Sequence, residues 1–467
     1  MVGKFEFTDK LKKNFYYMIV AGVVGLIMAF FLYPHNSHSR FWTNILLNAY
    51  FFTGIGIFGI FFASANQLGY GGWITLIKRI FMSLSGFIKV GAVFALLIIG
   101  GVWAHYHNLY SWSDPEVFKT ISNTKQTFFS TPFWTIRVIL YFLLWIFVGG
   151  AVIKAINSKN INDPKVYKRS KLMAALWIVI FAVSESFVSW DLIMGADPHW
   201  YSTLFGWYNF ASYGCAAFAF TILFIVYFKS KGYLPQVNEN HLHDVGKMMF
   251  GFSILWTYLW FDQFMLQWYG NIPEDTRYWV KRFDVPLFEV TIFVALTLNF
   301  LFPLLLFIKR DWKRNYKHAA FIAVVVIFGH YLDFFNMTMY EPNNAIKSDT
   351  VADAKKQAQA KVAAIFYAQN KTEDKAVKEE KTGTDAVAEK PEAKGDTKVD
   401  IKADTKGDDK EAEVKTYAGF GICEILIFTG FLGGFLLMFF TEFSKDAMFN
   451  ENDPYLKESL RLHVEYA

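Results

Sequence analysis

The sequence predicts an all-α integral membrane protein with about ten transmembrane helices. Of its 467 residues 54% are hydrophobic, and the apolar residues stand in long continuous blocks instead of periodic stripes. Many blocks reach roughly 20 residues, the length of helix that crosses a bilayer. Only helices and closed barrels satisfy every backbone polar group in lipid, and a barrel would show short alternating segments. The continuous blocks therefore indicate helices.

The ten expected spans follow one another along the chain, with Trp and Tyr near many of their ends, as in an interfacial aromatic belt. The first span follows a lysine-rich start, as a signal peptide does. Its apolar run is long, however, and no small-residue cleavage site follows it, so we expect it to be retained. We place the spans at 15–33, 43–62, 84–106, 133–155, 172–190, 207–228, 247–268, 286–308, 318–339 and 418–441.

The distribution of positive charge predicts the orientation. Lys and Arg gather at both ends of the chain and in the connections after spans 2, 4, 6 and 8, whereas the connections after spans 1, 3, 5 and 7 hold few. The positive-inside rule then puts both termini in the cytoplasm, which agrees with an even number of spans. Spans 2–5 and 6–9 run in the same order of directions. We therefore expect two four-helix bundles, flanked by helices 1 and 10.

Four regions follow from this layout. Residues 1–340 hold transmembrane helices 1–9, 418–445 hold helix 10, and 446–467 form a cytoplasmic tail. Residues 341–417 are a low-complexity charged insertion, expected on the periplasmic side and poorly ordered, apart from a potential helix over 355–367. A docking arm for an outer partner and a spacer without function are both open interpretations of this insertion.

Ionisable residues inside the spans are the candidate functional residues, because each costs roughly 2.5–3.5 kcal/mol to insert. Nearly all lie in the outer half of the membrane, and Lys89 is the exception. For Arg137, Glu289 and Glu424, pairing as structural ions or snorkelling to the interface is the competing interpretation. The proton-path candidates are Glu185, Asp262, His330 and Asp333, and the weaker candidates are Lys89, Arg137, Asp191, Glu289 and Glu424.

An acidic cluster in the outer half suits two tasks. It can accept protons from a quinol head group and release them outward, or it can form the exit half of a proton path. His330 and Asp333 stand three residues apart on one helical face, so they can hydrogen-bond or exchange a proton.

The sequence predicts no metal ligands and no redox centre in this chain. Cys215 and Cys423 both fall inside spans, which suggests no disulfide framework, zinc site or iron–sulfur cluster. Haem ligation by two His needs a pair at matching depth, and only His330 lies well inside a span. The net charge of +5 resides in the loops that set topology, and we expect no nucleic-acid partner.

Two outer stretches carry a family resemblance. Residues 189–205 (SWDLIMGADPHWYSTLF) and 263–275 (QFMLQWYGNIPED) resemble the outer loops of polysulfide-reductase C / NrfD-type membrane subunits. The chain looks closest to the F subunit of bacterial alternative complex III, a quinol:cytochrome c oxidoreductase of the respiratory electron-transport chain. The resemblance covers nearly the whole chain except the insertion.

The resemblance implies a non-redox, multi-pass subunit of the bacterial inner membrane that anchors its partners and takes part in proton translocation or quinone binding. Those partners would be a paralogous ten-helix quinol-site subunit, an iron–sulfur subunit, multihaem and monohaem cytochrome c subunits, and lipids. Asp191 matches the motif's Asp. Either His105 or His107 matches a His at the outer end of helix 3, so these three residues are the quinone-site candidates.

Two other classes of protein stay open. A stand-alone secondary transporter would purify alone and move its substrate in liposomes, although the sequence shows no inverted repeat and no pair of Gly/Pro-broken helices. A purely structural scaffold would use the outer acids as paired ions, so neutralising them would disturb assembly and not proton release.

Overall fold

The computed structural model describes residues 3–340 and 420–462, which are helical with one isolated β-bridge between Lys4 and Ala447. Nine helices in this part of the chain are long and apolar enough, by length and composition, to cross a membrane. The prediction of an all-α, multi-pass membrane protein is thus confirmed. The expected insertion, 341–417, with its potential helix, lies outside the described residues.

Each expected span within the described residues is helical. Most are single helices: α1 (Asp9–Leu32), α2 (His35–Leu68), α7 (Thr131–Ile156), α8 (Pro164–Leu192), α9 (Leu204–Ser230), α10 (Glu239–Gly270), α15 (Tyr316–Thr338) and α17 (Ile422–Ser444). The third is composite, with α3 (Lys78–Leu84), η2 (Ser85–Phe87) and α4 (Ile88–Trp103). The eighth joins α12 (Pro286–Leu296), a π-helical turn η5 (Thr297–Leu301) and α13 (Phe302–Phe307).

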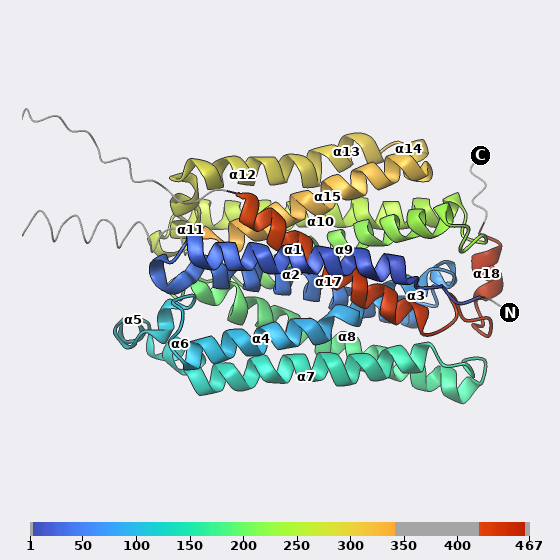
Figure 1. Cartoon of the computed structure of the whole chain (residues 1–467), viewed down its shortest axis with the longest axis horizontal. Helices are drawn as coiled ribbons and strands as arrows, with labels where there is room; N and C mark the ends of the chain where they lie inside the picture. Colours follow the sequence, from blue (N-terminus) through green and yellow to red (C-terminus); the bar gives the residue numbers. More distant parts are fainter. Residues whose placement is uncertain (1–2, 341–419, 463–467) are drawn as a thin grey trace, which may run out of the picture. The chain divides into compact units, whose positions relative to one another are not determined.

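Short helices fill the connections. They are η1 (Gly72–Ile74), η3 (Ser111–Ser113), α5 (Pro115–Thr120), α6 (Asn123–Phe128), η4 (Met194–Ala196), α11 (Pro273–Phe283), α14 (Arg310–Arg314) and α18 (Leu456–Leu460). Figure 1 shows α3, α14 and α18 at one end of the helices and α5, α6 and α11 at the other.

Helix α10 differs from the other expected spans. It is 32 residues long and covers the predicted span 247–268, but it carries several charged and His residues and is not among the nine apolar helices. Its start is fixed by Asn238, whose side chain accepts hydrogen bonds from the backbone N–H groups of Asn240 and His241. Such a cap satisfies donors that the first helical turn leaves free.

The π-helical turn has a cause in the sequence. Pro303 has no N–H, so the carbonyl of Asn299, four residues earlier, lacks its usual helical donor. Instead, the hydroxyl of Ser253 in α10 donates a hydrogen bond to that carbonyl. A hydroxyl from a neighbouring helix thus satisfies a backbone group that would otherwise be unpaired in an apolar interior.

Helix packing arranges the long helices around α2, which is almost wholly enclosed by the others. On one side α2 contacts α4, α7 and α8, which also contact one another in sequence. On the other side α2 contacts α9, and α9 packs against α10 and α15. Helix α1 lies against α17 with its backbone in close approach, because Gly22 faces Gly430.

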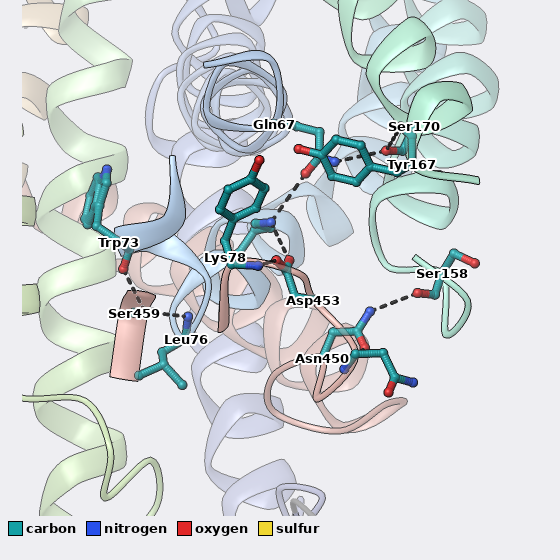
Figure 2. A network of polar contacts seen from close by, with 12 residues as sticks. Gln67, Trp73, Leu76, Lys78, Ser158, Tyr167, Ser170, Asn450, Asp453 and Ser459 are labelled. Atoms are coloured by element: carbon teal, nitrogen blue, oxygen red, sulfur yellow. Dashed lines mark hydrogen bonds and ion pairs between the residues drawn. The ribbon is translucent and has the colours of Figure 1, made fainter. Parts of the chain in front are cut away.

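The C-terminal segment is bound to the helix ends beside α3 (Figure 2). Lys78 Nζ forms a buried ion pair with Asp453 Oδ2 at 2.8 Å. Asn450 Nδ2 donates to the Ser158 carbonyl at 2.9 Å, and Ser459 Oγ donates to the Trp73 carbonyl at 2.9 Å. These contacts come from several helices, so the segment fastens their ends together.

Candidate functional site

The buried polar cluster around Asp333 joins three helices. Tyr208 and Ser212 of α9 donate hydroxyl protons to Asp333 Oδ1 and Oδ2, the second at 2.9 Å. Trp256 of α10 donates its indole N–H to Asp333 Oδ2 at 2.9 Å. His330, one helical turn before Asp333 on α15, has its Nδ1 2.9 Å from Ser212 Oγ. The Trp256 ring meets the His330 ring edge-on at a centroid distance of 5.3 Å.

Ser212 makes this cluster a candidate proton relay. A hydroxyl has one hydrogen, so it can donate to Asp333 while its oxygen accepts from His330 Nδ1–H. In the opposite arrangement a protonated Asp333 donates to Ser212, and Ser212 donates to His330 Nδ1. The two arrangements differ by one proton: imidazolium with an ionised carboxylate becomes neutral imidazole with a protonated carboxyl. The proton exchange expected between His330 and Asp333 would therefore pass through the Ser212 hydroxyl and not through a direct contact.

A second polar group lies beside Asp333, in α11. Arg282 is 3% exposed and donates from Nε to the Asn336 carbonyl at 3.2 Å and from Nη1 to the Tyr278 carbonyl at 3.1 Å. Its guanidinium lies 3.5 Å from the Tyr278 ring centre. Arg282 and Asp333 line one cavity of about 10 Å³, which approaches the space that one water needs. This cavity links the cluster to the helix end formed by α11.

Glu185 of α8 lies apart from these contacts. It is 3% exposed, and its Oε2 accepts a long hydrogen bond from Ser186 Oγ at 3.4 Å. The Glu185 carboxyl also interacts electrostatically with the Tyr213 hydroxyl, but neither Glu185 Oε1 nor that hydroxyl has a partner in hydrogen-bond geometry in the described part of the chain. Tyr213 also lines a cavity of about 20 Å³ between α2, α4, α7, α8 and α9, with Tyr50 and Thr53. That volume suits about one water.

Two of the sequence-predicted residues form an ion pair with each other. Arg137 of α7 binds Asp191 of α8 through Nη2–Oδ1 at 2.6 Å and Nε–Oδ2 at 3.1 Å. Tyr141 donates to Asp191 Oδ2 at 2.9 Å, and Trp134 donates to the Asp191 carbonyl at 3.2 Å. Both carboxylate oxygens of Asp191 therefore have partners inside the chain. This agrees with the interpretation of Arg137 as one half of a structural ion pair.

Glu424 of α17 is likewise paired. Arg40 Nη2 lies 2.7 Å from Glu424 Oε1, and the Gly421 N–H donates to Oε2 at 2.9 Å. Asn44 Nδ2 adds a longer contact to Oε1 at 3.3 Å. Both partners are buried, so this pair ties the start of α17 to α2.

The remaining span candidates stand outside these clusters. Asp262 on α10 is half-buried, whereas Glu289 on α12 and Lys89 on α4 are exposed. Within the described residues none of the three makes a hydrogen bond or an ion pair. Of the four proton-path candidates, His330 and Asp333 therefore lie in one cluster. No hydrogen bond or ion pair in the part of the chain that the structure describes connects Glu185 or Asp262 to that cluster.

No hydrogen bond or ion pair within the described residues joins the quinone-site candidates His105, His107 and Asp191 to one another. His105 is exposed, with a left-handed backbone (φ 52°). His107 is buried, with Nε2 3.2 Å from the Ile98 carbonyl and Nδ1 accepting from the Leu109 N–H at 3.4 Å. Burial lowers the pKa of His107 below the usual value for a histidine, which favours the neutral ring. Both of its nitrogens and both Asp191 carboxylate oxygens have partners within the chain.

The two stretches that carry the family resemblance touch each other. Trp200 of the first donates its indole N–H to the Asp275 carbonyl of the second at 3.1 Å. Asp197 binds Lys281 of α11 at 3.1 Å and lies 4.0 Å from Arg277. Burial opposes ionisation of Asp197, but these two cations outweigh it and hold its pKa below the usual value.

Sequence reasoning missed two kinds of residue at these sites: uncharged side chains that bind the predicted residues, and arginines from outside the spans. Tyr208, Ser212 and Trp256 are uncharged, so a search for ionisable residues in spans passes over them. Arg40 and Arg282 lie outside the expected spans. A faint signal existed for the α9 residues, because Tyr208 and Ser212 are four apart and share a helical face.

No protein-family model matches the chain, and no curated protein matches it. Among the described residues no group of three or more His, Cys, Asp or Glu side chains converges as a metal site would require. The fold defines an all-helical, multi-pass membrane protein with a buried carboxylate–hydroxyl–imidazole cluster.

Proposed function

We propose that this chain is a non-redox membrane subunit of a bacterial quinol:cytochrome c oxidoreductase of the alternative complex III type, and that it moves protons through the Asp333 cluster. The observation that carries the proton role is Ser212 Oγ, 2.9 Å from both Asp333 Oδ2 and His330 Nδ1. The identity of the complex rests on the resemblance of residues 189–205 and 263–275 to outer loops of that family.

The proposed topology has ten spans, with α10 as the seventh and both chain ends in the cytoplasm of a bacterial inner membrane. The contacts among α2, α4, α7 and α8, and those of α9 with α10 and α15 and of α12 with α15, support two groups of four. Basic residues of α3 and α14, among them Lys78 and Lys313, lie at the helix end that holds α18, which supports the orientation (Figure 1).

In this proposal the proton leaves towards α11. Asp333 accepts a proton through Ser212 and releases it into the small cavity that it shares with Arg282. Arg282 lines the same cavity and carries the positive charge on the α11 side of it. Quinol oxidation then belongs to the paralogous subunit, because His107 and Asp191 are already engaged within this chain.

The anchoring role follows from the paired ions. Arg137–Asp191 and Arg40–Glu424 fix α7 to α8 and α2 to α17, and the Asp197–Lys281 contact stiffens the loops on the α11 side. We expect that side to receive the iron–sulfur and cytochrome c subunits.

Co-purification tests the identity of the complex. The tagged chain is extracted from native membranes in mild detergent, and a reduced-minus-oxidised optical spectrum is recorded with the protein composition. Haem c absorbance with an iron–sulfur subunit and a second ten-helix protein is expected. A colourless chain that purifies alone would contradict the proposal and favour the secondary transporter.

The proton role is tested with Asp333→Asn in the assembled complex reconstituted in vesicles. Proton release should fall by roughly 100-fold, the low end of what a positioned acid–base group contributes. Ser212→Ala should lower it too, because the bridge is lost while the carboxyl stays. Asp262→Asn is the matched control, since it removes the same charge from a half-buried site without partners among the described residues. Equal proton release in all three variants and the parent would contradict the role.

A further inference from the structure

A groove opens between the last turns of α7 and the first turns of α8. It is lined by Ala151, Lys154, Ala155, Ser158, Val166, Arg169 and Met173, and its volume is about 500 Å³. Both helices are membrane spans by length and composition, so the groove lies where spans end and head groups begin. The C-terminal segment borders it, because Asn450 donates to the Ser158 carbonyl.

Small residues on α7 keep the groove open. Ala151 and Ala155 are one turn apart and face α8 across it. Gly150, next to Ala151, also has open space beside it, since a Cβ placed there would meet no atom within 4 Å. Larger side chains at these positions would fill the space that the two helices leave.

The charge of the groove is positive and unneutralised. Lys154 and Arg169 come from different helices and are both exposed. Neither makes an ion pair or hydrogen bond within the described residues, and no carboxylate lines the groove. The nearby Asp163 is engaged as the N-cap of α8, where it accepts from the Lys165 N–H at 2.8 Å. Two cations without an acid are suited to a phosphate, which Arg binds through two N–H groups.

The surface beyond the two cations is apolar. Phe147 on α7 is 70% exposed and stands one turn before Ala151, and Leu172 on α8 is 69% exposed beside Met173. A free phosphate ion would use only the charged part of this surface. A phospholipid would use both parts, with its phosphate on the cations and its acyl chains along Phe147 and Leu172.

We propose that the α7–α8 groove binds the head group of an anionic phospholipid, with the phosphate between Lys154 and Arg169 and the glycerol over Ala151 and Ala155. Basic pockets between membrane helices bind such head groups in this way. The site is separate from the Asp333 cluster and does not depend on the function proposed for it.

Lipid binding is measured on the purified protein in its native assembly after delipidation. Phosphatidylglycerol in mixed micelles is titrated against the shift in Tm, with phosphatidylcholine and inorganic phosphate as separate arms. Phosphatidylglycerol should raise the Tm and the other two should not. Lys154→Gln/Arg169→Gln should bind about 25-fold more weakly, roughly fivefold for each cation near an anionic lipid.

Two further variants separate the groove from general surface charge. Lys165→Gln/Lys168→Gln removes the same charge from the start of α8 outside the groove lining and should keep parental affinity. Ala151→Phe fills the groove, keeps both cations, and should abolish the shift. An equal loss in both charge variants, an unaffected Ala151→Phe, or an equal shift with inorganic phosphate would each overturn the proposal.

Discussion

The guanidinium of Arg137 meets the carboxylate of Asp191 with two parallel contacts, at 2.6 and 3.1 Å, between two membrane helices. The Asp191 side chain is fully buried, and Arg137 also stacks 4.0 Å from the Phe128 ring centre. Both Asp191 carboxylate oxygens accept hydrogen bonds, whereas Arg137 Nη1 has no partner among the described residues. Bidentate geometry of this kind helps a buried ion pair to offset its desolvation.

Removing one partner of this pair should destabilise the fold strongly. Arg137→Met leaves Asp191 as an unpaired buried charge, which costs about 3–5 kcal/mol in comparable pairs. Thermal stability in detergent, followed by size-exclusion chromatography, measures the loss. Arg137→Met/Asp191→Leu should recover much of it, because no charge is left. Lys89→Met is the control from an exposed site, and a parental profile for Arg137→Met would show that the pair contributes nothing.

The contact of α1 with α17 predicts a second effect. A Cβ on Gly22 would lie 2.4 Å from the Gly430 Cα, and backbone atoms cannot swing away as a flexible side chain can. Gly22→Ala should therefore force the helices apart and cost about 1–3 kcal/mol, typical of overpacking. Gly100→Ala on α4 meets no atom within 4 Å and should be neutral or slightly stabilising. Melting curves that coincide for the two variants would contradict the close approach.

The docked C-terminal segment should make stability depend on pH. His241, in the first turn of α10 before the predicted span, has Nε2 3.1 Å from Ser459 Oγ of α18. Burial lowers the pKa of His241 to about 4, against about 6.5 in an unfolded chain. The unfolded chain then binds more protons between these values, so stability is complete above about pH 6.5 and falls as the pH drops towards 4.

The expected loss is up to about 3 kcal/mol, from about 1.4 kcal/mol for each pKa unit. Thermal unfolding and proteolysis of the C-terminal segment between pH 8 and 4.5 measure it. His241→Gln keeps a polar side chain without titrating and should flatten this part of the profile. An acid loss of the same size in His241→Gln would assign the effect to other groups.

The candidate site was only partly predictable. His330 and Asp333 are close in sequence, and helical geometry was enough to place them on one face of α15. Their real connection runs through Ser212, more than a hundred residues away on α9. The grouping of Glu185 and Asp262 with them stays without support from the contacts, because depth in the membrane does not say which way a helix face turns.

The sequence by itself determined the class of the protein and the placement of its helices along the chain. Lipid forces each spanning segment to satisfy its own backbone, so long apolar runs read directly as helices. Only the tertiary structure decided which buried polar groups meet. Arg40 and Glu424 are 384 residues apart, and their pairing depends on how α2 and α17 rotate and pack. Rotation and packing follow from side-chain shapes on several helices at once, which no single segment encodes.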